Sequence, residues 1–185
     1  GISYQTVNYG VVTGALIGEY QIKNTNTILC AIRELGITDV ESVKKGFLNV
    51  VQLTGLMGRW QILCNQPLIV CDTGHNVGGW KYLSNQIIHQ ECHQKHIVFG
   101  MVDDKDIDSV MELLPKDAIY YWSQATTHRA IPSQVVAQKG LAHGLVGRVY
   151  DSVESAYMAA LANAVPDDFV FIGGSSYIVS DLLAC

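Results

Sequence analysis

Residues 58–80 read GRWQILCNQPLIVCDTGHNVGGW, and this stretch decides the fold. The apolar run at residues 68–71 has the length of a buried strand and ends at Asp72. A polar turn containing Gly74 follows, and the next residues are typical of a helix N-terminus. In α/β sheets a strand that ends in a carboxylate, then a glycine turn, then a helix, is a common site for a nucleotide or an anion. We therefore expect such a site here, with Arg59 supplying a fixed positive charge for a phosphate.

From about residue 60 to the end, short apolar runs alternate with segments of helical periodicity. The runs predict strands at residues 60–63, 68–71, 97–99, 118–122, 147–150 and 169–172. The periodic segments predict helices at residues 78–91, 107–114, 133–140, 152–163 and 177–183. This alternation predicts an α/β fold, a Rossmann-like, mostly parallel sheet with helices on both faces. Because ligands bind beyond the carboxyl ends of such strands, the polar loops that follow them are candidate site segments.

The N-terminal part of the chain has a different pattern. Its predicted elements are one or two short strands within residues 1–17, a helix from an N-cap among residues 24–27 to about Leu35, and a shorter helix at residues 38–47. A shift in composition near residues 55–58 predicts a domain boundary. We therefore expect one unit at residues 1–56 and a second at residues 57–185.

The composition restricts the class of protein. The 185-residue chain is 49% hydrophobic and 16% charged with a net charge of -5, which supports a packed core and argues against disorder. The acidic balance gives no electrostatic reason to expect nucleic acid, and no apolar run is long enough to span a bilayer, so neither is an expected partner. The five cysteines form no CxxC pair, which favours a reducing, cytoplasmic location. Cys30 and Cys71 are expected to be small buried hydrophobic residues.

Five short motifs occur in order along the chain. They are GEYQIKN at residues 18–24, GRWQ at 58–61, DTGHN at 72–76, GMVDDKD at 100–106 and GSSY at 174–177. Together they resemble the motifs of the Mur ligase superfamily, and the last two resemble those of its folate branch, the folylpolyglutamate and dihydrofolate synthases. The resemblance covers essentially the whole chain. The DTGHN turn departs from the family pattern, because Thr73 and Gly74 replace a common Gly-Ala pair and Val77 stands where proline is frequent.

The resemblance implies an ATP-dependent ligase that joins L-glutamate to a folate, to dihydropteroate, or to both. In that reaction ATP phosphorylates a carboxylate, and the amine of glutamate attacks the acyl phosphate. The implied cofactors are ATP and Mg²⁺. The family's P-loop, magnesium ligands and most of its folate site precede the region matched here, and neither GxxxxGKS nor GxxxxGKT occurs in these residues. We therefore expect an inactive C-terminal portion, with residues 1–56 as the tail of the central ATP-binding domain and residues 57–185 as the complete Mur ligase C-terminal domain.

The resemblance also implies roles for individual residues. Asn24, Arg59 and Asp72 match residues that contact ATP. His75 is the candidate catalytic residue, in a position to contact a phosphate or an incoming carboxylate. The residues alone also permit structural roles: a helix N-cap for Asn24, a helix cap in a loop for Asp72, and a loop histidine bonded to backbone for His75.

Residues for substrate binding are expected in the loops that follow other strands. Ser175 precedes a helix and is expected to bind glutamate, because a helix N-terminus accommodates a carboxylate. In the family, the loop that matches residues 100–106 faces the inter-domain cleft, so Lys105 is expected to help hold an anion there. Arg129 belongs to a loop similar to a family loop near the same cleft.

One further cluster consists of His89, Cys92, His93 and His96. This spacing predicts one helical face able to bind zinc. Because zinc sites usually recruit ligands from a second element, no metal site is expected in this chain. Two other functions stay open: the C-terminal domain of a peptidoglycan Mur ligase, and a nucleotide-binding or interaction module without catalysis. The last two motifs favour the folate branch over the peptidoglycan branch.

Overall fold

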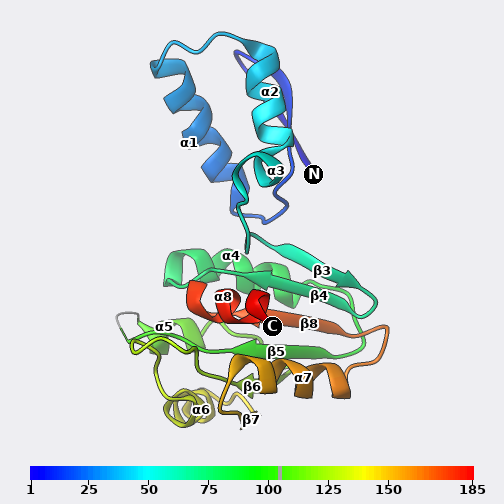
Figure 1. The fold of residues 1–185 in the computed structure, drawn as a ribbon, viewed down its shortest axis with the longest axis vertical. Helices are drawn as coiled ribbons and strands as arrows, with labels where there is room; N and C mark the ends of the chain where they lie inside the picture. The colour runs from blue at the N-terminus through cyan, green and yellow to red at the C-terminus, as the bar shows by residue number, and fades with distance from the viewer. Residues whose placement is uncertain (104–105) are drawn as a thin grey trace. The chain divides into compact units, whose positions relative to one another are not determined.

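The computed structural model describes residues 1–103 and 106–185. These residues form two compact units, Gly1–Trp60 and Gln61–Cys185, each with its own sheet and buried core (Figure 1). Among the described residues, no helix combines the length and the apolar character needed to cross a membrane. All five cysteines are free thiols. Cys71 is buried as expected, whereas Cys30 is exposed, so the expectation that it is buried is wrong.

The Gly1–Trp60 unit combines a β-hairpin with three helices. Its elements are β1 (Ile2–Thr6), β2 (Gly10–Gly14), α1 (Gln21–Glu34), α2 (Val40–Leu48) and α3 (Val50–Thr54). The hairpin is antiparallel, and β2 packs against α2. Tyr9, Val12 and Val43 form a small buried core. The predicted strands and both predicted helices are confirmed, and α3 is an additional helix that the sequence pattern does not predict.

Helix α1 begins earlier than the sequence predicts. Its first residue is Gln21, and the N-cap residue Tyr20 makes no side-chain capping hydrogen bond. The expected N-cap among residues 24–27 is therefore wrong. Asn24 lies inside the helix, where its Nδ2 donates to Oε1 of Gln21 at 3.2 Å. The helix ends where predicted, because Gly36 has a φ of 69°, which glycine adopts without strain.

The Gln61–Cys185 unit is built around a six-stranded sheet. In chain order the strands are β3 (Gln61–Asn65), β4 (Leu68–Asp72), β5 (Lys95–Phe99), β6 (Ala118–Trp122), β7 (Gly147–Val149) and β8 (Phe169–Gly173). Their spatial order is β3-β4-β8-β5-β6-β7. Strand β3 pairs antiparallel with β4, and the other neighbours are parallel, so the predicted mostly parallel sheet is confirmed.

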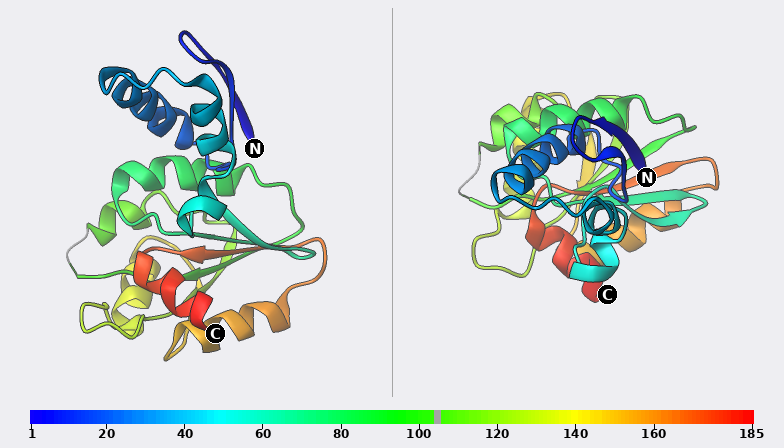
Figure 2. Two further views of the ribbon diagram at one scale, coloured as in Figure 1. Left: turned by 45° about the horizontal axis from the view of Figure 1, so that its top comes forward. Right: turned by 90° about the horizontal axis from the view of Figure 1, so that it is seen from above.

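Helices cover both faces of this sheet, as predicted (Figure 2). They are α4 (Val77–Ile88), α5 (Ile107–Met111), α6 (Ser133–Ala142), α7 (Val153–Asn163) and α8 (Ser176–Ala184). The chain runs outward from β4 through β5 and β6 to β7, then returns through α7 to place β8 between β4 and β5. Because crossovers between parallel strands are right-handed, this reversal moves the later helices to the opposite face. Accordingly α7 and α8 pack against each other, while α5 packs against α4 and α6.

Alternation along the strands divides the buried core between the two faces. Val98 belongs to the cluster that includes side chains of α7 and α8. Phe99 and Phe171 point to the other face and meet the ring of Trp80 edge-on, at centroid distances of 5.6 and 5.8 Å. Trp80 is fully buried, although the pattern of α4 does not single it out. Helix α4 ends at Ile88, earlier than the predicted residue 91, and the Ile88 side chain is 47% exposed.

At the amino-terminal edge of the sheet, the buried carboxylate of Asp168 joins several segments. It accepts hydrogen bonds from Gln94 N at 3.0 Å and Val165 N at 2.8 Å, and from His96 Nε2 at 3.2 Å. Nδ1 of His93 lies 3.3 Å from the same group. Burial by itself raises the pKa of Asp168, but these hydrogen bonds outweigh burial and hold the pKa below its usual value.

Replacing Asp168 with asparagine is expected to lower the free energy of unfolding by at least about 2 kcal/mol at neutral pH, since hydrogen bonds to a charged group contribute about 1.5–3 kcal/mol each. The folded pKa is depressed, so this stabilisation is fully present above the unfolded pKa of about 4 and is lost as the pH falls through the folded value. The difference between wild type and Asp168→Asn should therefore shrink in acid. Urea unfolding followed by tryptophan fluorescence at several pH values measures it.

The neighbouring Asp167→Asn is the matched control, because Asp167 is exposed. It removes the same charge one residue away and is expected to change stability by less than about 0.5 kcal/mol. Equal losses in the two variants, or a difference that does not depend on pH, would contradict the role of the buried carboxylate.

Candidate functional site

The carboxyl ends of four parallel strands meet at one edge of the sheet. Asp72 of β4 lies beside Gly173 of β8. Gly173 in turn lies beside Phe99 of β5, which lies beside Trp122 of β6. The polar loops after these strands therefore open at the same edge, as the sequence predicts, and this edge is where α/β sheets bind ligands.

The loops at this edge pack so closely that only glycine fits. Gly174 has a φ of 108°, and a Cβ there would collide with the carbonyl oxygen of Gly100. A Cβ on Gly100 would lie 2.5 Å from the carbonyl oxygen of Ser123. A Cβ on Gly173 would lie 2.8 Å from the carbonyl oxygen of Asp72. The backbones after β8, β5 and β6 are therefore held in direct contact, with no room for a side chain between them.

Asp72 begins a turn whose shape is set by local hydrogen bonds. The residue is 1% exposed, and its Oδ1 accepts from the N–H of Gly74 at 2.8 Å. Asn76 is the N-cap residue of α4, and its Oδ1 accepts from the N–H of Gly79 at 2.8 Å. A Cβ on Gly74 would meet Cδ1 of Leu83, so a larger residue here would displace that buried side chain. The turn combines a buried carboxylate with a helix N-terminus, an arrangement suited to nucleotides and anions.

His75 lies in the middle of this turn and has a defined tautomer. Its Nδ1 is 3.1 Å from the carbonyl oxygen of Thr73. Because a carbonyl only accepts hydrogen bonds, Nδ1 carries the hydrogen, and the neutral ring presents Nε2 as an acceptor. The structural alternative for His75, a loop histidine bonded to backbone, is thus confirmed for one ring nitrogen. The other nitrogen remains a candidate for ligand contact.

Cys71 precedes Asp72 and is a chemically unreactive neighbour. Burial raises the pKa of its thiol to about 12, and the charge of Asp72 contributes to the rise. The thiol is therefore protonated at neutral pH and acts as a small hydrophobic residue of the core.

Ser175 lies where the sequence predicts, between β8 and α8. It is 1% exposed, and its Oγ accepts a hydrogen bond from the N–H of Ile178 at 3.2 Å. The side chain is therefore the N-cap of α8. Because capping uses an oxygen lone pair, the hydroxyl hydrogen is the group that Ser175 can offer to a carboxylate.

The loops after β5 and β6 pair with each other. Val102 and Ala130 form an antiparallel bridge. The N–H of Asp103 donates to the carbonyl oxygen of Arg129 at 3.0 Å, and Nε of Arg129 lies 3.9 Å from Oδ1 of Asp103. Arg129 is thus tied to the loop that carries the predicted anion contact. Lys105, the residue predicted for that contact, lies outside the described residues.

A polar hollow of about 330 Å³ lies beside the loop after β6. Its lining includes Gln124, Thr126, Asp151 and Ser152. Thr126 is anchored to α8, because its N–H and Oγ1 both donate to the carboxylate of Asp181, at 2.7 and 3.1 Å. The hydrogen bonds to Asp181 therefore fix the loop after β6, which forms one side of the hollow. The hollow has the size of a small polar molecule.

Arg59 and Asn24 belong to the Gly1–Trp60 unit. Nη1 of Arg59 donates to the carbonyl oxygen of Gly58 at 3.3 Å. Both neighbours of Arg59 have positive φ, 66° at Gly58 and 47° at Trp60, and for a bulky residue such as tryptophan this is unusual. Backbone of this kind is common at binding sites. Asn24 lies inside α1, whose N-cap residue is Tyr20, so its structural alternative as a helix N-cap is wrong. The Asn24 side chain is exposed.

The predicted helical face of His89, Cys92, His93 and His96 does not exist. Helix α4 ends at Ile88, and His89 is its C-cap residue. His96 lies in β5, where its buried ring bonds to Asp168. Within residues 1–103 and 106–185, no group of three or more His, Cys, Asp or Glu side chains is arranged to hold a metal ion.

A mostly parallel α/β sheet with a carboxylate turn at its carboxyl edge places the chain in the class of α/β domains whose ligand sites lie at that edge. Residues 58–176 match the family described as Mur ligase, glutamate ligase domain. The chain therefore belongs to the Mur ligase family through this domain, as its motifs predict.

Relatives with assigned activities are longer than this chain. The dihydrofolate synthase/folylpolyglutamate synthase of Escherichia coli is 30% identical over 162 residues, which are 86% of this chain and 37% of that protein. A probable bifunctional folylpolyglutamate synthase/dihydropteroate synthase of Halobacterium salinarum is 26% identical over 168 residues, 90% of this chain and 20% of that protein. The chain thus spans well under half the length of these relatives.

Solved structures share the fold. Escherichia coli FolC in complex with DHPP and ADP has a TM-score of 0.82 at 24% identity, covering 97% of this chain and 42% of that chain. The bifunctional folylpolyglutamate synthase/dihydrofolate synthase of Yersinia pestis has a TM-score of 0.77 at 25% identity, covering 97% of this chain and 42% of that chain.

Sequence reasoning missed two residues that shape the unit, Trp80 and Asp168. Trp80 lies in the first turn of α4, three residues before the apolar Leu83, and this helical spacing is a signal that both residues share a buried face. Asp168 directly precedes the buried strand β8 and so lies where the chain enters the sheet. Nothing in the sequence predicts that its carboxylate meets His96.

Replacing Gly174 with alanine is expected to lower the free energy of unfolding by at least about 3 kcal/mol, because backbone strain and overpacking each cost about 1–3 kcal/mol. The added Cβ meets the carbonyl oxygen of Gly100, which cannot turn aside. The matched control is Gly144→Ala, where φ is 75° but nothing lies within 4 Å of the Cβ. That variant should lose about 1–2 kcal/mol. Chemical denaturation compares them, and equal losses would contradict the close packing.

Proposed function

We propose that this chain is the C-terminal part of an ATP-dependent ligase that adds L-glutamate to a folate, to dihydropteroate, or to both. ATP phosphorylates the acceptor carboxylate, the amine of glutamate attacks the acyl carbon, and phosphate leaves. Membership of the Mur ligase family and the activities of the relatives support this proposal. Across the described residues 1–103 and 106–185, no three or more His, Cys, Asp or Glu side chains are grouped to hold a metal ion. The Mg²⁺ ligands are proposed to belong to the portion of the ligase that this chain does not span.

The observation that carries the proposal is the turn after β4. Asp72 presents a buried carboxylate whose Oδ1 is held by Gly74, beside the N-terminus of α4. A carboxylate held in this way is suited to accept hydrogen bonds from ribose hydroxyls. Arg59 is proposed to contact the ATP phosphates, because a guanidinium stays charged and bonds two oxygens at once. Asn24 is proposed as a further ATP contact through its side-chain amide.

Glutamate is proposed to bind at the carboxyl edge of the sheet. Its carboxylates are matched there by the hydroxyl of Ser175 at the N-terminus of α8 and by Arg129 in the loop after β6. Lys105 is a further proposed anion contact. The neutral form of His75 presents Nε2, which is proposed to contact a phosphate or the incoming glutamate.

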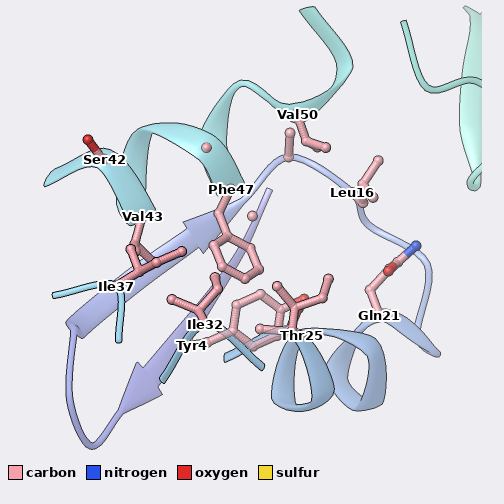
Figure 3. A pocket seen from close by; sticks show the side chains of 14 residues that line it. Tyr4, Leu16, Gln21, Thr25, Ile32, Ile37, Ser42, Val43, Phe47 and Val50 are labelled. Atoms are coloured by element: carbon pink, nitrogen blue, oxygen red, sulfur yellow. The ribbon is translucent and has the colours of Figure 1, made fainter. Parts of the chain in front are cut away.

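The Gly1–Trp60 unit supports a proposal for the domain organisation. It contains an apolar groove of about 380 Å³ whose lining includes Tyr4, Ile32 and Phe47, with side chains from β1, α1 and α2 pointing inward (Figure 3). The hydroxyl of Tyr4 is buried without a hydrogen-bond partner among the described residues. A surface of this kind suits a partial domain that more polypeptide covers. We therefore assign residues 1–56 to the tail of a central ATP-binding domain and residues 57–185 to the glutamate ligase domain.

Two alternatives are distinguishable from this proposal. A peptidoglycan Mur ligase would add an amino acid to a nucleotide-linked precursor and not to a folate, so acceptor specificity separates the two. A binding module without catalysis would not need a P-loop in the coding sequence that precedes Gly1, whereas the ligase requires one. A cytoplasmic location is part of the proposal and is supported by the five free cysteines.

In the complete ligase, Arg59→Ala is expected to lower kcat/KM for ATP-dependent glutamate addition about 100-fold, because two charge-assisted hydrogen bonds contribute about 3 kcal/mol to binding phosphates. The matched control is Arg33→Ala, which removes an exposed arginine of α1 that pairs with Glu34 at 2.8 Å. Steady-state assays of glutamate incorporation measure both variants, and circular dichroism verifies that they fold. Unchanged turnover in Arg59→Ala would remove Arg59 from the site.

The isolated 185-residue chain is expected to add no glutamate to folate or dihydropteroate and to bind MgATP weakly, with a dissociation constant of about 1 mM or higher. The physical reason is that a nucleotide held from one side loses most of its phosphate contacts. Isothermal titration calorimetry and glutamate incorporation measure this, with the Escherichia coli relative as positive control. Rapid turnover by the isolated chain would refute the proposed division of the site.

A further inference from the structure

The buried side chain of Trp80 bonds to the turn that carries Asp72 and His75. Its indole Nε1–H donates to the carbonyl oxygen of Gly74 at 3.2 Å. The N–H of the same Gly74 donates to Oδ1 of Asp72 at 2.8 Å. Both backbone polar groups of Gly74 are therefore bonded, one to the carboxylate of the candidate site and one to the indole.

The hydrogen bond from the indole to the Gly74 carbonyl oxygen matters because Gly74 is a glycine. The side chain of Leu83 fills the space beside this residue, where a Cβ would meet its Cδ1. Glycine has more conformational freedom than any other residue, and a turn that contains it is less rigid unless other contacts restrain it. The indole supplies that restraint at the residue that adjoins His75.

Trp80 is itself rigidly placed. It is 0% exposed, and Phe99 and Phe171 meet its ring edge-on from two central strands. Its backbone N–H donates to the carbonyl oxygen of Asn76 at 2.9 Å, inside the first turn of α4. The direction of the indole N–H is thus set by the sheet and the helix together. The hydrogen bond from this N–H in turn fixes the position of the Gly74 carbonyl group.

We propose that Trp80 is a positioning residue for the candidate site: through Gly74 it keeps the carboxylate of Asp72 and the imidazole of His75 in the geometry that binds the nucleotide. This inference rests on the proposed function. It extends the site from the surface turn to the centre of the core, because preorganised groups bind and react more effectively than mobile ones.

The variant that tests this is Trp80→Phe, which retains an aromatic ring in the core and removes only the indole N–H with part of the ring. The matched control is Trp122→Phe. Trp122 is 1% exposed, its ring meets the same Phe99 at a centroid distance of 6.1 Å, and its indole makes no hydrogen bond among the described residues. Both variants delete the same atoms from the same aromatic cluster, so their loss of thermal stability should be similar.

Two measurements separate positioning from packing. In the 185-residue chain, NMR measures the amide hydrogen exchange of Gly74, whose N–H bonds to Asp72. It should accelerate about fivefold in Trp80→Phe beyond any global change, the effect of one lost hydrogen bond. In the complete ligase, the KM for ATP should rise about fivefold in Trp80→Phe. In Trp122→Phe both quantities should stay within about twofold of wild type once global stability is subtracted.

The inference is overturned if Trp80→Phe and Trp122→Phe give the same exchange rates in the turn and the same KM for ATP. Failure of the proposed function has a different signature: the wild-type complete protein would then add no glutamate. In that case the exchange rate of the Gly74 amide still decides whether Trp80 holds the turn.

Discussion

The backbone of Gly174 lies so close to the carbonyl oxygen of Gly100 that no Cβ fits between them, and the larger unit depends on this contact. It joins the loops after β8 and β5, the last strand of the chain and a strand formed much earlier. Strand β8 lies between β4 and β5, so the carboxyl edge is complete only when this last strand is in place. The loops after β8 and β5 are therefore positioned by an interaction between glycine backbones.

The two edges of the sheet have different chemistry. At the amino-terminal edge, His96 donates through Nε2 to Asp168, and its Nδ1 lies 2.9 Å from the hydroxyl of Tyr121, which also accepts from Asn163 at 3.1 Å. These groups bond one another and stabilise the fold. At the carboxyl edge, one ring nitrogen of His75 and the hydroxyl oxygen of Ser175 are bonded to backbone groups of their own loops. That difference is why ligand binding is assigned to the carboxyl edge.

Much of the larger unit could be predicted, because strands and helices here follow local rules. The run before Asp72, the N-cap at Asn76 and the N-cap at Ser175 each depend on residues a few positions apart. Prediction failed where a distant contact decides the outcome. The spacing of His89, Cys92, His93 and His96 suggests one helical face. In the structure His96 lies instead in strand β5 and bonds to Asp168, which is 72 residues further along the chain.

The sequence by itself determined the order of strands and helices along the chain, the glycine turn after Asp72 and the family, because periodicity, capping and motif spacing are local properties. Only the tertiary structure decided that β8 enters the middle of the sheet, and that His96 serves the core. It also decided that the indole of Trp80 turns back to hold Gly74. These outcomes depend on which buried groups meet across the sheet. A buried polar group is destabilising without a hydrogen bond, so its partner is set by the tertiary contacts and not by neighbouring residues in the sequence.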